Sequence, residues 1–305
     1  MDFSFNIPSG GLNATPEIIA TLARRGEELD FAYVGIPDHI VIPRNVQSPY
    51  PYTKDGTYSG SGHILDQLAV ASFIAGQTSK IRILTSVLVL PLRSAVLTAK
   101  MLSTIDVLSN GRLTVGCGVG WLREEFDAIG APDFDKRGIV AGEYISCFKE
   151  LWTSNNPSFE GEYVRFTDIT FEPKPIQKPH PPIWIGGESP AALRRAAKLG
   201  DGWFPLGGNP RFPMQTVQQL SNALDKIYRY GEKVGRDLTK FDLAYSFPGS
   251  FTGNAEQTIE HIRAFKTAGV QHLMVSLGAT FTDPVSDTLE RMEYFASEIA
   301  PYVNS

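Results

Sequence analysis

The chain has 305 residues, of which 42% are hydrophobic and 20% charged, and its 28 Lys and Arg against 33 Asp and Glu give a formal net charge of −5. This balance excludes a disordered, collagen-like or membrane-embedded chain and disfavours nucleic acid as a partner. The longest apolar run, residues 81–92, is interrupted by Arg82 and Pro91 and is shorter than the roughly 20 residues that a membrane span requires.

The sequence has two cysteines, Cys117 and Cys147, which are too few for a disulfide framework. The first residues, MDFSFNIPSGG, contain neither the basic segment nor the apolar segment of a secretion signal. We therefore expect a cytoplasmic protein.

Strand-like and helix-like patterns alternate along the chain. The first strand, residues 2–8, is followed by a helix over 15–30, in which Thr15 is placed to cap and Pro16 to occupy the first turn. Further strands are expected at 31–36, 81–90, 112–119, 183–187, 202–205, 241–247 and 270–278. Further helices are expected at 66–78, 94–109, 138–152, 190–200, 215–235, 255–269 and 287–303, with a shorter helical piece at 121–129.

Eight strands that each precede a helix predict a closed parallel barrel, because an open doubly wound sheet usually stops near about six strands. Two irregular segments, about 37–62 and 154–182, interrupt the alternation, and the stretch 161–173 within the second is expected to form a small hairpin. The expected fold is thus α/β, a (β/α)8 TIM barrel with insertions after strands 2 and 4, in a single domain over residues 1–305.

Functional groups of such a barrel lie at the carboxyl ends of the strands. Asp38 and His39 end the second strand and are the only adjacent acid and imidazole at a strand end. This pair can bind a cofactor ring or transfer a proton, and a structural role in the loop is the alternative. His and Asp residues do not converge from several strand ends, so we expect no metal site.

The fourth strand ends in a glycine pattern, Gly116, Gly118 and Gly120. The glycine-rich motif of a dinucleotide-binding (Rossmann) fold follows the first strand of that fold, whereas this pattern follows three strand–helix units. Its position therefore disfavours a dinucleotide-binding motif. The glycines allow either close approach of a flat ring or phosphate to the backbone, or tight packing.

The fifth strand ends in Gly186 and Gly187, and Ser189 and Pro190 then begin a helix. Ser189 is suited to cap this helix, and free N–H groups at a helix start also suit a phosphate, so the two roles are compatible.

A short helical piece after the glycines carries Trp121, Glu124 and Glu125. Its spacing places Trp121 and Glu125 on one face, where they could reach a site; simple solvation of the acids is the alternative. Cys117, between two glycines of a strand, is expected to be a small core residue and not a nucleophile.

In combination, these motifs resemble those of the luciferase-like flavin and deazaflavin oxidoreductases. The resemblance lies in the run IRILTSVLVLPLRSAVLTAKMLSTIDVLSNGRLTVGCGVGWLREEFDAIG, the preceding PDH and the later PHPPIWIGGESPAALRRAAKLGDGW, and it spans roughly residues 2–205. The chain is most similar to the presumed coenzyme F420-dependent branch. The family fold is a (β/α)8 barrel with an insertion, which agrees with the independent strand count.

The resemblance implies a set of site residues. His39 and Asp38 would lie beside the cofactor ring system, and Ser86-Val87 would form a bulge against one ring face, where relatives often have a non-prolyl cis peptide. Gly116 and Gly118 would lie near the cofactor together with Trp121, and its phosphate would be held by Gly186, Gly187 and Ser189.

One departure from the family pattern concerns the proton donor. Relatives often carry a charged residue immediately after the glycine that matches Gly118, whereas this chain has Val119. His39 or Glu125 would then be the catalytic acid. The same departure leaves the choice between F420 and FMN open.

The resemblance implies a cytoplasmic oxidoreductase that uses F420 for hydride transfer to or from a small organic substrate. An FMN-dependent two-component monooxygenase, with a flavin reductase as partner and O2 as co-substrate, is the alternative, and a non-catalytic flavin-binding barrel is a third. The loop 37–62 is expected to help cover the substrate with Tyr50, Tyr52 and Tyr58. A homodimer is also expected, whereas the substrate is not determined by the sequence.

Overall fold

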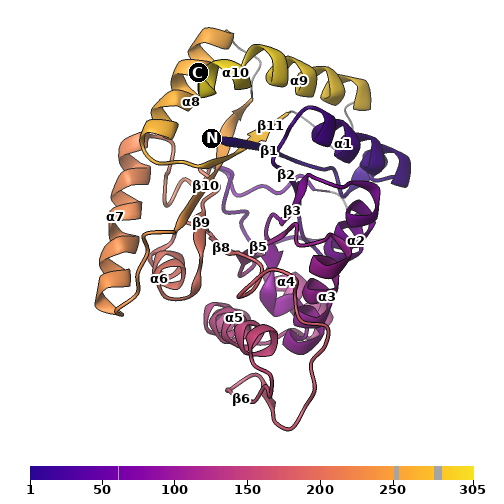
Figure 1. Ribbon diagram of the computed structural model, residues 1–305, viewed down its shortest axis with the longest axis vertical. Coiled ribbons are helices and arrows are strands. Elements are labelled where there is room, and N and C mark those ends of the chain that lie inside the picture. The colour runs from indigo at the N-terminus through magenta and orange to yellow at the C-terminus, as the bar shows by residue number, and fades with distance from the viewer. Residues whose placement is uncertain (61, 251–253, 278–283) are drawn as a thin grey trace.

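The structure, a computed structural model, describes residues 1–60, 62–250, 254–277 and 284–305, and eight parallel strands form a closed ring in it (Figure 1). In ring order the strands are β1 (Asp2–Asn6), β2 (Tyr33–Ile36), β3 (Arg82–Thr85), β5 (Leu113–Gly118), β8 (Ile183–Gly186), β9 (Gly202–Phe204), β10 (Asp242–Ser250) and β11 (His272–Ser276). The ring closes because β11 pairs with β1 and β3 pairs with β5. The predicted (β/α)8 barrel is confirmed; Gly278, the expected end of the last strand, lies outside the described residues.

Helices surround the ring of strands (Figure 1). They are α1 (Pro16–Glu28), α2 (Gln67–Gln77), α3 (Ala95–Leu108), α4 (Arg123–Ile129), α5 (Arg137–Thr153), α6 (Pro190–Leu199), α7 (Val217–Lys233), α8 (Ala255–Thr267), α9 (Val285–Glu298) and α10 (Ala300–Asn304). Short 3-10 turns occur at Gly11–Asn13, Leu90–Leu92 and Phe134–Lys136. Thr15 caps α1 and Pro16 occupies its first turn, as expected.

Three elements differ from the sequence-based expectation. The helix expected over 287–303 divides into α9 and α10, because Pro301 has no N–H to donate one turn back. The strand expected over 81–90 is interrupted at Ser86-Val87 and resumes as β4 (Leu88–Val89) beside β5; the two residues are joined by the non-prolyl cis peptide bond that the family resemblance implied. The small hairpin, β6 (Phe159–Glu160) with β7 (Arg165–Phe166), begins before the expected stretch.

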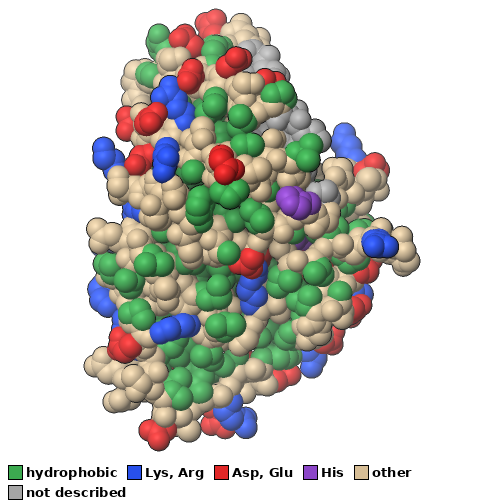
Figure 2. All heavy atoms as spheres, turned by 90° about the vertical axis from the view of Figure 1, so that its right-hand side faces the viewer, with side chains coloured by type: hydrophobic (Ala, Val, Ile, Leu, Met, Phe, Trp, Pro, Cys, Tyr) green, Lys and Arg blue, Asp and Glu red, His purple; other side chains and the backbone are tan. Residues whose placement is uncertain are grey.

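One side of the outer surface, covered by helices α1, α2 and α3, carries many exposed hydrophobic side chains (Figure 2). On the side that α1, α2 and α3 cover, hydrophobic side chains gather across the centre and lower part of the face (Figure 2). Leu97, Val107 and Leu108 of α3 are exposed. Among the described residues, no helix combines the length and the hydropathy needed to cross a membrane.

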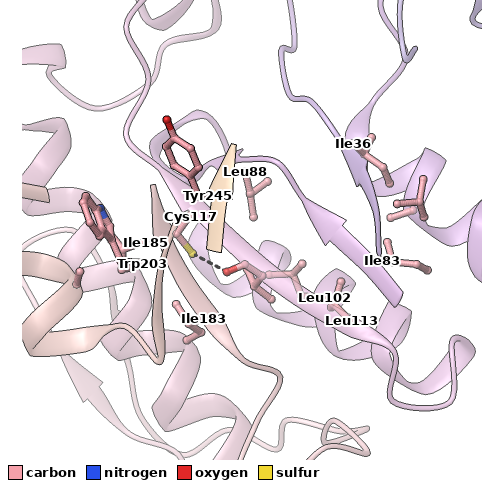
Figure 3. Close-up of a cluster of buried hydrophobic side chains, with 14 of the residues drawn as sticks. Ile36, Ile83, Leu88, Leu102, Leu113, Cys117, Ile183, Ile185, Trp203 and Tyr245 are labelled. Carbon is pink, nitrogen blue, oxygen red and sulfur yellow. Dashed lines mark hydrogen bonds between the residues drawn. The ribbon is translucent and has the colours of Figure 1, made fainter. Parts of the chain in front are cut away.

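Strand side chains alternate between the barrel interior and the surrounding helices, and the two main clusters of buried side chains follow from this alternation; a third, small cluster is formed by Val89, Leu92 and Phe126. A small cluster of strand residues fills the interior: Tyr33, Leu84, Trp184, Phe204, Ala244 and Met274. The larger cluster lies between strands and helices and includes Cys117, Ile183 and Trp203 (Figure 3). Burial raises the pKa of the Cys117 thiol to about 12, so Cys117 is the small core residue that the sequence predicted.

Candidate active site

A cavity of about 420 Å³ opens at the carboxyl ends of the strands. Its walls come from three places: the irregular loop after β2, the ends of β3, β5 and β8, and the start of α4. The predicted site residues among its lining are Asp38, His39, Ser86, Val87, Gly118, Trp121, Glu125, Gly186 and Gly187. Gly116 and Ser189 are not part of the lining.

His39 and Glu125 form an ion-pair contact at the cavity wall. His39 Nδ1 lies 2.9 Å from Glu125 Oε2, and the Glu125 side chain is only 2% exposed. The other carboxylate oxygen, Oε1, accepts the N–H groups of Ile40 at 2.7 Å and Val41 at 3.2 Å. Within the described part of the chain His39 Nε2 has no hydrogen-bond partner, which leaves this nitrogen available to a bound molecule.

Asp38 lines the cavity, but its carboxylate is used by the protein itself. Arg93 donates to both Asp38 oxygens at 2.8 Å, and the N–H of Val89 donates to one of them at 2.9 Å. Arg93 also donates to Asp66, the residue that caps α2. Asp38 therefore fixes the backbone beside His39, and Arg93, which sequence reasoning missed, holds it there.

The glycines at the strand ends make room for neighbouring protein groups. A Cβ atom on Gly118 would lie 2.5 Å from Val87 Cγ2, and one on Gly186 would lie 3.1 Å from Val87 Cγ1. Val87 thus occupies the space between β5 and β8 at the cavity wall. A Cβ atom on Gly116 would lie 2.1 Å from the carbonyl oxygen of Thr85, so strand packing requires glycine there.

Ser189 lies behind the cavity wall as the N-cap of α6. Its Oγ accepts the N–H of Ala192 at 3.2 Å, and Pro190 occupies the first turn. The structure therefore shows the capping role that the sequence suggested.

Aromatic rings of the loop after β2 cover one side of the cavity. The ring centroid of Tyr50 lies 5.3 Å from Tyr58 and 5.0 Å from Trp121, and Tyr52 packs at 5.6 Å from Tyr50. The ring of His39 lies 5.7 Å from that of Tyr58. Burial raises the pKa of Tyr58 to about 12, so these phenols stay neutral over the ordinary pH range.

Glu124 anchors this aromatic loop. Its carboxylate accepts the N–H groups of Gln47 at 2.7 Å and Ser48 at 2.9 Å and the hydroxyl of Ser48 at 2.6 Å. Burial opposes ionisation, but these donors outweigh it and lower the pKa of Glu124 to about 2. The interpretation of Glu124 and Glu125 as merely solvated acids is wrong, since both bind the loop after β2.

Glu188 is a buried acid that sequence reasoning missed, although it directly follows the glycines at the end of β8. Its Oε1 accepts the N–H of Leu206 at 2.7 Å, and its Oε2 lies 3.4 Å from both the Tyr52 hydroxyl and the Asn209 amide. Burial raises the pKa of Glu188. It joins the aromatic loop to the segment after β9.

Two partly buried arginines lie near Gly120, which lines the cavity. Arg137 donates to the carbonyl oxygens of Gly120 and Phe134, and Arg195 of α6 donates to that of Gly138. Burial lowers the pKa of both guanidinium groups. Among the described residues neither has a carboxylate partner, so this arginine pair, Arg137 and Arg195, leaves positive charge available to an anion.

Comparisons with known proteins agree with the barrel fold. The sequence model of the luciferase-like monooxygenase family matches residues 1–296. An uncharacterised protein of Mycobacterium tuberculosis is 32% identical over 267 residues, which cover 80% of this chain and 92% of that protein. An FMNH(2)-dependent dimethylsulfone monooxygenase of Pseudomonas putida is 38% identical over 170 residues, which cover 55% of this chain and 45% of that enzyme.

Among solved structures, the coenzyme F420-dependent tetrahydromethanopterin reductase from Methanopyrus kandleri superimposes with a TM-score of 0.75. The two chains are 17% identical, and the superposition covers 99% of each. At this identity the similarity is one of fold.

We expect Glu124→Gln to release the aromatic loop, because an amide accepts hydrogen bonds more weakly than a carboxylate. Limited proteolysis near residues 47–48 should become roughly fivefold faster, which corresponds to about 1 kcal/mol of local stability. Asp127→Asn, on the exposed face of the same helix, is the control and should leave cleavage unchanged.

The pH dependence of this anchor follows from the direction of the pKa change. Because the folded-state pKa of Glu124 lies below its ordinary 4.5, the anchor is fully present above about pH 4.5 and is lost as the pH falls toward about 2. Trp121 fluorescence, measured against a Trp121→Phe reference, should follow this loss in the native protein and not in Glu124→Gln. Equal acid titrations in the two proteins would contradict the assignment.

Proposed function

The chain belongs to the luciferase-like monooxygenase family, and on that premise we propose that it is an oxidoreductase that uses coenzyme F420 to transfer a hydride to or from a small organic substrate. The observation that carries this proposal is the His39–Glu125 pair. It places an imidazole with a free nitrogen at the wall of a cavity at the strand ends. When a hydride is transferred to the carbon of a carbonyl or imine, the oxygen or nitrogen must take up a proton, and an imidazole at the cavity wall can donate it.

The residues present fit a cofactor of this type. The cavity volume of about 420 Å³ lies within the range of ligand pockets, and tyrosine and tryptophan rings form a large part of its wall. The arginine pair and the N-terminal end of α6 would receive the phosphate, since guanidinium groups without a neighbouring carboxylate and helix N–H groups both attract anions. Gly186, Gly187 and Ser189 belong to this same end of the site.

When bound, the deazaflavin would supply or accept the hydride. Glu125 holds the His39 ring through Nδ1, so that Nε2 would face a substrate oxygen or nitrogen and could donate a proton to it. In the oxidation direction the same nitrogen accepts the proton. The aromatic loop would keep water away from the reacting atoms.

The second candidate is a two-component FMN-dependent monooxygenase. The 38% identity to an enzyme named as FMNH(2)-dependent favours it, and that chemistry would need O2 and a separate flavin reductase. A non-catalytic flavin-binding barrel would account for Val119 in place of a charged residue, but it gives the His39–Glu125 pair no use.

Cofactor titration separates these candidates. We expect the purified protein to bind F420, detected as a change in the fluorescence of the cofactor, and to bind FMN much more weakly. Tight binding of FMN without binding of F420 would replace the proposal with the monooxygenase candidate.

We expect His39→Ala to reduce kcat roughly a hundredfold or more, the usual contribution of a positioned acid or base, while the Kd of the cofactor changes little. Once a substrate is in hand, steady-state rates and fluorescence titration measure the two effects. His63→Ala, a substitution of the exposed histidine at the end of the same loop, is the control. An unchanged kcat in His39→Ala would remove His39 from the mechanism.

We also propose that the protein is a homodimer that buries the outer face of α2 and α3. No residue of α2 is charged, and α3 exposes Leu97, Val107 and Leu108. A twofold interface joins a surface patch to its own copy, which suits an apolar patch; on the two helices Lys100 of α3 is the exposed charged residue.

Leu97→Glu is expected to shift the protein from dimer to monomer in analytical ultracentrifugation, because it places a desolvated charge at the centre of the contact. Val234→Glu, a substitution of an exposed residue that follows α7, should leave the mass unchanged. A native protein that sediments as a monomer would overturn this interface.

A further inference from the structure

A buried hydroxyl group, that of Ser9, lies at the active-site cavity and has no role in the reaction proposed above. Ser9 follows β1 at the carboxyl end of the first strand, lines the cavity and has no exposed surface. In the part of the chain that the structure describes, its Oγ has no hydrogen-bond partner. A buried polar atom without a partner costs free energy, so its presence calls for an explanation.

The other buried side-chain atoms that lack a partner lie elsewhere. Within the described ranges they belong to five residues that do not line the active-site cavity: Gln67, Arg82, Thr114, Tyr163 and His272. Ser9 therefore combines an unsatisfied buried hydroxyl with a place at which a ligand would bind.

The backbone around Ser9 is held by the segment that leads into α2. The carbonyl oxygen of Ser9 accepts the N–H of Leu65 at 2.8 Å, and the next residue, Gly10, forms an antiparallel bridge with Ile64. Ile64 also lines the cavity. These contacts fix Ser9 on the rim of the barrel, and a hydroxyl on a rigid support is suited to position a ligand.

The carboxylates of the cavity lining are already engaged by the protein. Asp38 is paired with Arg93, and both oxygens of Glu125 are bonded to groups of the segment after β2. The Ser9 hydroxyl and the Nε2 nitrogen of His39 are two groups that the lining still offers to a ligand. A carbonyl oxygen has two lone pairs and can accept a hydrogen bond from each of them.

We propose that Ser9 is a substrate-binding residue whose hydroxyl bonds the reacting oxygen of an uncharged ketone or aldehyde, or of the corresponding alcohol in the reverse direction. This inference rests on the proposed function, which supplies the carbonyl group. The hydroxyl donates to the carbonyl oxygen, orients the substrate and stabilises the negative charge that develops on this oxygen during hydride transfer. Binding of the substrate also satisfies the hydroxyl that the folded protein leaves without a partner.

The stability of Ser9→Ala separates this role from a structural one. The substitution removes no hydrogen bond of the protein, so the midpoint temperature of thermal unfolding should equal that of the native protein or exceed it. A clear fall in this temperature would show that the hydroxyl stabilises the fold and would overturn the proposal.

The ligand test compares acetophenone with α-methylstyrene, which has a similar shape but no carbonyl oxygen. Binding is followed by Trp121 fluorescence, with Trp121→Phe as the reference, on the protein alone and on the protein saturated with whichever cofactor, F420 or FMN, it binds. Ser9→Ala should bind acetophenone roughly three- to tenfold more weakly than the native protein does, the range for one neutral hydrogen bond, and should bind α-methylstyrene equally well.

Ser72→Ala is the matched control, because it removes a hydroxyl that donates to the carbonyl oxygen of Leu68 within α2, away from the cavity lining. It should bind both probes as the native protein does.

Equal affinity of the native protein and Ser9→Ala for acetophenone overturns the role of Ser9 while the proposed function stands; a water molecule as the partner of the hydroxyl would give this result. Equal weakening toward both probes also overturns it, and so does a native protein that does not distinguish them. Failure to bind F420 overturns the F420-dependent function instead, whereas a loss confined to acetophenone on the FMN-loaded protein still supports the carbonyl site at Ser9.

Discussion

The geometry of this site depends on two adjacent carboxylates at the start of α4, which bind the backbone of a loop that has little internal structure. Residues 37–60 form no helix or strand, so their N–H groups need acceptors from elsewhere. Glu124 accepts from Gln47 and Ser48, and Glu125 accepts from Ile40 and Val41. Carboxylate oxygens are strong acceptors for backbone N–H groups, and the loop is held at two points.

That attachment positions the groups that can do chemistry. Glu125 uses one oxygen for the loop and the other for His39, so the acid that fixes the loop also orients the imidazole. Ser48, whose N–H and hydroxyl Glu124 accepts, lies two residues before Tyr50, so this contact positions the tyrosines over the cavity. A second connection, from Arg93 to Asp38 and Asp66, joins the end of β2 to the start of α2. The barrel supplies a rigid rim, and these hydrogen bonds and ion pairs attach the loop after β2 to it.

The distribution of charge around the site follows from the same contacts. The acids Asp38 and Glu125 of the cavity and the neighbouring Glu188 are engaged by protein donors. Among the described residues, Arg137 and Arg195 on the side of α5 and Arg211 and Lys226 on the side of α7 have no carboxylate within 4.0 Å. Buried acids that are already bonded cannot repel a ligand strongly, and free cations attract one. This distribution of charge supports the proposal that the site binds an anionic cofactor.

The sequence by itself determined the barrel, because eight alternations of period-2 and period-3.6 hydrophobicity leave few ways to bury both faces of the strands. It also determined that His39, Ser86, Gly118 and Gly186 stand at strand ends, and it identified the caps of α1 and α6 from Thr15 and Ser189. Only the tertiary structure decided that Glu125 meets His39 across 86 residues of chain, that Gly116 serves strand packing, and that Glu188 joins two loops. The reason is physical. Periodicity records which face of an element is buried, whereas the path of an aperiodic loop depends on long-range hydrogen bonds that exist only once the barrel has brought the strand ends together.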